Sequence, residues 1–202
     1  MNRYAHLVAA MAASLSFAAA GAAQDDAAAE TPDTYSFDDG ENAIHGATGA
    51  VCPKDMGDLV LIQVLSFDRE EEHLGIGCQY GSPLGFSATI SVLQSDEVGL
   101  VGAGDSAARW NRQLYTILGS YPGALPANVS GLEGDPASSL RGALFTANAN
   151  GLPVRVGVWQ IDAGDWQYSA QTTFAPTSAD TWALAQATRA ALLSAKAAAD
   201  AS

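Results

Sequence analysis

The stretch Leu74–Gln94, LGIGCQYGSPLGFSATISVLQ, carries the clearest structural signal in the chain, a hydrophobic period of two residues. From Leu74 to Tyr80, Leu, Ile, Cys and Tyr alternate with Gly, Gly and Gln. After the turn Gly81-Ser82-Pro83, residues Phe86 to Gln94 alternate in the same way. Because successive side chains of a strand point to opposite faces, the pattern predicts two antiparallel strands that share one buried face.

Further strands are predicted on both sides of this hairpin. Leu59–Phe67 (LVLIQVLSF) is almost continuously apolar, which predicts a central strand covered on both faces. Leu140–Asn148 and Val154–Ile161 are joined through Asn150-Gly151, a strong hairpin signal. Trp166–Phe174 alternates again and has one polar face.

Two stretches change to the helical period. The first begins after Asp105, a plausible N-cap, and ends near Gly119; the second opens with the capping pattern of Thr177 and Asp180 and runs to about Lys196. The order is therefore β-β-β-α-β-β-β-α. It predicts an α+β fold, a mainly antiparallel sheet of about six strands with two helices packed on one of its faces. In element order alone, the chain resembles the PsbP/Mog1-type sandwich, and that resemblance implies this architecture only.

The N-terminus predicts export. Arg3 precedes an apolar run that ends in the small residues of Ala20-Gly21-Ala22 and Ala23, so cleavage is expected at about Ala22 or Ala23. The Ala-rich style is typical of signal peptides that lead to the periplasm, and no later segment is apolar enough to span a membrane. We therefore expect a cleaved signal peptide over residues 1–22, a disordered acidic leader over 23–42, and one globular domain over 43–202.

The net charge of the chain limits the kinds of molecule that it is expected to bind. Removing Arg3 lowers the count of Lys and Arg from 9 to 8 against 22 Asp and Glu, so the mature charge is near −14. Phosphate backbones should repel such a chain, which argues against nucleic-acid binding. A cationic protein or a small ligand remains as a partner, and the pattern leaves the oligomeric state open.

The cysteine count is 2, Cys52 and Cys78. In an oxidising compartment an even pair within one domain favours a disulfide. Two buried thiols or a redox pair are the alternatives, although a redox pair normally has C-x-x-C spacing.

The sequence motifs for metal binding, catalysis and cofactor binding are weak. Export leaves His45 and His73, and neither belongs to a zinc-binding pattern such as H-E-x-x-H. No G-x-S-x-G or S-x-x-K is present, and Gly102-Ala103-Gly104 precedes a helix without the strand pairing of a dinucleotide site. We predict no cofactor, no metal site and no catalytic residue, and we interpret Asp162 and Asp165 as turn residues.

One surface is a candidate for binding. Trp159 and Arg155 fall on the same face of the strand Val154–Ile161, opposite its valines, and His73 closes a charged link between two strands. These three residues could line a groove, but the alternative that we favour for Trp159 is that a helix covers it. The sequence favours a non-catalytic periplasmic binding or interaction module, with a hydrolase of unrecognised site or a structural envelope component as the alternatives.

Overall fold

A computed structural model describes residues 34–69, 72–83, 86–95, 106–127, 132, 134, 139–175 and 179–201, all within one compact unit, Asp33–Ser202. The predicted signal peptide and the predicted capping residues Asp105 and Thr177 lie outside the described residues.

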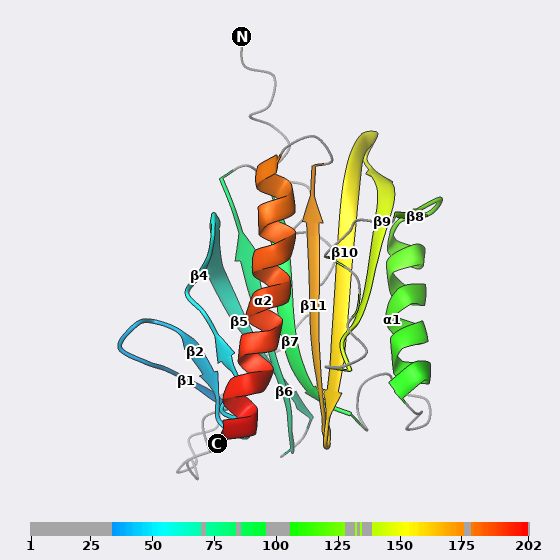
Figure 1. Ribbon diagram of the computed structural model, residues 1–202. Coiled ribbons are helices and arrows are strands. Elements are labelled where there is room, and N and C mark those ends of the chain that lie inside the picture. Colours follow the sequence, from blue (N-terminus) through cyan, green and yellow to red (C-terminus); the bar gives the residue numbers. More distant parts are fainter. Residues whose placement is uncertain are drawn as a thin grey trace, which may run out of the picture. The chain divides into compact units, whose positions relative to one another are not determined.

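The main element is an eight-stranded sheet in the order β4-β5-β6-β7-β11-β10-β9-β8, with every neighbouring pair antiparallel (Figure 1). Its strands are β4 (Asp55–Met56), β5 (Leu59–Arg69), β6 (Glu72–Gly81), β7 (Ser87–Gln94), β8 (Leu125–Ala127), β9 (Arg141–Ala149), β10 (Leu152–Ala163) and β11 (Trp166–Phe174). The α+β prediction is confirmed. The expected count of about six strands was too low, because the short strands at both edges have no periodic signal of their own.

A second, three-stranded sheet consists of β1 (Tyr35–Phe37), β2 (Ala43–His45) and β3 (Val51–Cys52). The disordered acidic leader was expected to extend to residue 42. Residues 34–42 instead form β1 and the turn that leads to β2, so the expected extent of the leader is corrected. The carboxylate of Asp38 accepts hydrogen bonds from the backbone N–H groups of Gly40 and Asn42 at 2.9 and 2.8 Å. The hydrogen bonds from Asn42 also lower the pKa of Asp38. These local bonds close the turn between β1 and β2 despite the acidic composition.

The predicted disulfide between Cys52 and Cys78 is present, with a Cα–Cα distance of 6.3 Å. It joins β3 to β6, and both half-cystines are buried. Such a bond fits an extracellular or periplasmic protein, where an oxidising environment maintains it.

The two helices, α1 (Ser106–Ser120) and α2 (Ala179–Ala201), pack against different faces of the sheet. On β10, Val156 and Val158 pack with Ile117 of α1, whereas Trp159 and Ile161 belong to the core that includes Leu192 of α2. Alternate residues of one strand thus enter two cores, and the expectation that both helices share one face was wrong. In Figure 1, α2 lies in front of the sheet beside β11, and α1 lies beside β9. No helix of the described residues is long and apolar enough to cross a membrane.

Strand β5 is not the central strand that its apolar run predicts. Among the described strands, only the two-residue β4 lies beyond it, so β5 is close to the edge of the sheet. Ile62 is 72% exposed, and the register of β5 against β6 shifts between Leu61 and Gln63. A bulge at this point turns part of the apolar run toward solvent.

Candidate functional site

A polar cluster forms where the apolar face of β10 ends. Along this face Val156 and Val158 are followed by Gln160 and Asp162, and Gln160 is completely buried. The side-chain amide of Gln160 donates to both carboxylate oxygens of Asp162, at 3.3 and 3.1 Å. Its own carbonyl oxygen has no hydrogen-bond partner within the described part of the chain. A buried acceptor without a donor is uncommon in folded proteins, and it makes this cluster a candidate for contact with a ligand or a water molecule.

Helix α1 begins at this cluster. The hydroxyl of Ser106 donates a hydrogen bond to Asp162, and Nε of Arg109 donates to the same carboxylate at 3.1 Å. The first turn of α1 has no acidic residue of its own. Because the N-terminal end of a helix carries a partial positive charge, Asp162 supplies from β10 the negative charge that the helix lacks. The turn residue of the sequence prediction is therefore a strand residue that anchors α1 to the sheet.

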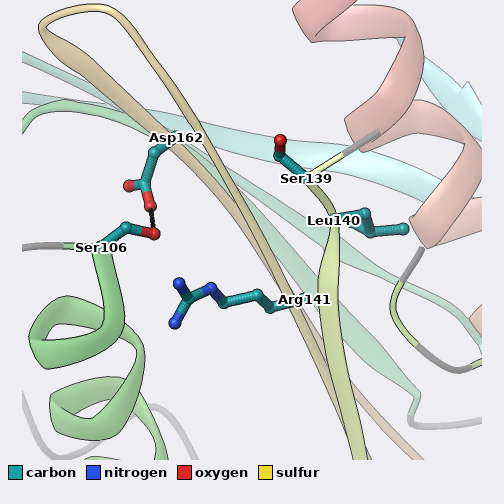
Figure 2. A pocket seen from close by; sticks show the side chains of 5 residues that line it. All are labelled: Ser106, Ser139, Leu140, Arg141 and Asp162. Carbon is teal, nitrogen blue, oxygen red and sulfur yellow. Dashed lines mark hydrogen bonds between the residues drawn. The ribbon is translucent and has the colours of Figure 1, made fainter. Parts of the chain in front are cut away.

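A pocket of about 510 Å³ opens beside this anchor, lined by Ser106, Ser139, Leu140, Arg141 and Asp162. Figure 2 shows the guanidinium of Arg141 extended toward the side of Ser106, while the side chain of Leu140 points away. Arg141 is half-buried and faces Gln160 across the β9–β10 ladder. Its guanidinium has no hydrogen-bond or ion-pair partner among the described residues.

The charges that the described residues bring to this pocket do not balance. Asp162 is engaged by Arg109, and the side chains of that pair are only 16% and 12% exposed. Within the described part of the chain, Arg141 therefore contributes a positive charge without an acidic partner, in a partly desolvated position. A guanidinium presents its N–H donors in a planar fork that matches a carboxylate or phosphate group, so the pocket is suited to an anion.

Asp162 holds this cluster together. Both of its carboxylate oxygens accept hydrogen bonds, from Ser106, Arg109 and Gln160. These bonds fix the start of α1 relative to β10, which is a positioning role.

Trp159, the aromatic residue of the predicted binding surface, is completely buried. Its indole N–H donates to the carbonyl of Leu132 at 2.8 Å. Its ring occupies space left by two glycines: a Cβ on Gly142 would lie 2.8 Å from the ring, and Gly157 lies against its other end. Trp159 thus belongs to the core, and its assignment to an exposed groove is corrected.

The other two residues of that predicted surface are not brought to the pocket. Arg155 lies on β10 opposite Thr146 and Phe174, and its Nε atom is buried without a hydrogen-bond partner in the described part. His73 lies on β6 with Asp68 as its cross-strand neighbour, and its side chain is outside the described set.

His45, one of the two histidines that remain after export, is a core residue of 1% exposure. Its Nδ1 lies 2.9 Å from the hydroxyl of Thr48, and its ring meets the edge of Trp166 at 4.9 Å. Thr48 also bonds the hydroxyl of Tyr168, whose pKa is raised, chiefly by burial. An imidazole that is this deeply buried is not accessible to a solute. The role of this network is structural, because it connects β2 to β11.

One signal in the sequence points to the polar cluster. On the face Val154, Val156, Val158, Gln160, Asp162, two polar residues extend an apolar row at the same period of two. Ser106 and Arg141 give no such signal, because only the tertiary structure brings them together. Among the described residues, no group of three or more His, Cys, Asp or Glu side chains could hold a metal ion. Comparisons with protein families, with curated proteins and with solved structures give no match to this chain.

Proposed function

We propose that the protein is an exported, non-catalytic binding module, and that its pocket takes a small anionic ligand through Arg141. The pattern of residues 1–22 and the disulfide support export to the periplasm. The observation that carries the ligand assignment is the guanidinium of Arg141, which is half-buried, faces the pocket and has no protein partner among the described residues.

The size and chemistry of the pocket support this assignment. A volume of about 510 Å³ is within the range of sites that bind small molecules. Ser106, Ser139 and Arg141 add hydroxyl and guanidinium groups to the lining. On a chain of net charge −13, the many acids disfavour anions over most of the surface, so an anion site requires a local cation such as Arg141.

The test is a titration of the mature chain with citrate, succinate and inorganic phosphate, followed by calorimetry and by NMR of the solute. We expect Arg141→Gln to weaken binding of the preferred anion about tenfold to hundredfold, the cost of losing a charged hydrogen bond. Arg189→Gln on α2 removes an equal charge away from the pocket and should leave affinity unchanged.

Each result has a clear meaning. If none of these anions binds, or if Arg189→Gln weakens binding as much as Arg141→Gln does, the assignment to this pocket is wrong. Recovery of the anion chemically unchanged supports a binding module. Turnover of a bound ester or phosphoester would instead favour the hydrolase alternative.

A second candidate function rests on the net charge. A total of 22 Asp and Glu against 9 Lys and Arg favours a cationic protein as a partner. In the described part, Lys54 pairs with Glu41 and Lys196 with Asp200, so these cations are already engaged by acids of the chain itself. This candidate predicts capture of a basic protein from envelope extract, with affinity falling as salt is added. Salt-independent capture would contradict it, and a stable oligomer without a ligand would favour a structural envelope component.

A further inference from the structure

The outer edge of β5 is open over most of its length. β4 pairs only with Leu59 and Val60, and the N–H of Leu61 donates to the carbonyl of Lys54 at 2.8 Å. From Gln63 to Arg69, no strand of the described residues pairs with this side of β5. An unpaired row of backbone N–H and C=O groups is a template for another extended strand.

The side chains of this edge do not protect it. The segment Leu59–Phe67 contains no charged residue and no proline, the two kinds of residue that usually block edge pairing. Ile62 is 72% exposed, Val60 46% and Phe67 38%. Phe67 lies over Gly77 of β6, where a Cβ would be 2.9 Å from its ring, so the apolar surface is held in place rather than folded inward. Two register irregularities, near Ile62 and between Phe67 and Asp68, are the guarding features found along the described part of this edge.

The charge of the chain indicates what covers this edge. Two copies, each of net charge −13, repel one another wherever their acids meet. The uncharged run Leu59–Phe67 is a place where identical chains approach without opposing like charges. A cationic partner, in contrast, finds no acid on this run to recognise.

Symmetry also favours a second copy. An antiparallel pair of identical strands has a two-fold axis, so each residue contact is made twice. A register centred on Leu65 sets Gln63 opposite Phe67 of the other copy and Leu65 opposite itself. Asp68 then lies opposite Ile62, away from its own counterpart. The pairing from Ile62 to Asp68 is about 24 Å long, a length common for strands in sheets.

We propose that the protein forms a two-fold dimer through antiparallel pairing of the β5 edges, which joins the two sheets into one. The dimer is independent of the proposed ligand pocket, whose residues come from α1, β9, β10 and the approach to β9.

The experiment is sedimentation velocity of the mature protein over an about hundredfold range of concentration, because a dimer responds to mass action. We expect a dimer for the wild type and a monomer for Leu65→Lys, which places two like charges opposite each other at the axis. Leu152→Lys is the matched control, since Leu152 is 47% exposed on β10, and it should remain a dimer.

A second measurement guards against a folding defect in Leu65→Lys. Hydrogen exchange of the wild type at high and low concentration should show protection of the β5 amides that grows with concentration. A wild-type monomer at every concentration overturns the proposal. A dimer that survives Leu65→Lys, or one without concentration-dependent protection of β5, overturns it as well.

Discussion

Replacing Trp159 by alanine should lower the free energy of unfolding by about 3–5 kcal/mol, the largest effect expected of any single substitution in this protein. The side chain is completely buried, and its removal also leaves the carbonyl of Leu132 without its donor. Gly142 and Gly157 border the ring and have no side chains with which to fill the cavity. Urea denaturation followed by circular dichroism measures the change.

Two further variants separate the contributions. Trp159→Phe keeps most of the buried area and loses the indole N–H, so we expect a smaller loss of about 1–3 kcal/mol. Tyr115→Ala removes an aromatic side chain that is 74% exposed and should change stability by less than about 0.5 kcal/mol. A loss below about 1 kcal/mol for Trp159→Ala would contradict the assignment of this residue to the core.

Removing the disulfide should have the second largest effect. The bond closes a sequence separation of 26 residues, and the loop-entropy model then gives about 3.5 kcal/mol of stability. The double variant Cys52→Ala/Cys78→Ala tests this without leaving a single reactive thiol. Its effect should be seen as a shift of the urea midpoint, because the variant changes the constraint on the unfolded chain.

The control is a thiol count on the wild type. Unfolded without reductant, the wild-type protein should show no free thiol, since the structure pairs Cys52 with Cys78. Two titratable thiols, or a double variant as stable as the wild type, would show that the disulfide is not part of the protein in solution.

Only part of the candidate site could be predicted from the sequence. Gln160 and Asp162 interrupt the apolar row of β10 at the same period, so a polar feature beneath the sheet was predictable from local pattern alone. Its partners were not predictable. Ser106 is separated from Asp162 by 56 residues and belongs to a helix. Its hydroxyl reaches the carboxylate only because α1 packs on this face, and helix placement depends on contacts that no local window contains.

Part of the fold could likewise be predicted from local sequence. Alternation predicted β6, β7 and β11 close to their observed bounds, the Asn150-Gly151 turn predicted the pairing of β9 with β10, and helical spacing predicted α1 and α2. These features follow from local sequence because a strand or helix buries one face at a fixed period. The even pair of cysteines likewise predicted the disulfide, since the chain offers each cysteine one possible partner.

Only the tertiary structure determined where each strand lies in the sheet and which residues are buried. The run Leu59–Phe67 is as apolar as a central strand, yet its place near the sheet edge depends on which distant strands pair beside it. The same holds for Trp159, which is buried because α2 and the segment at Leu132 close over its face. Pairing and burial between distant segments are properties of the assembled chain. The charge of Arg141 and the edge of β5, each without a partner in the described part of the chain, therefore appear only in the tertiary structure.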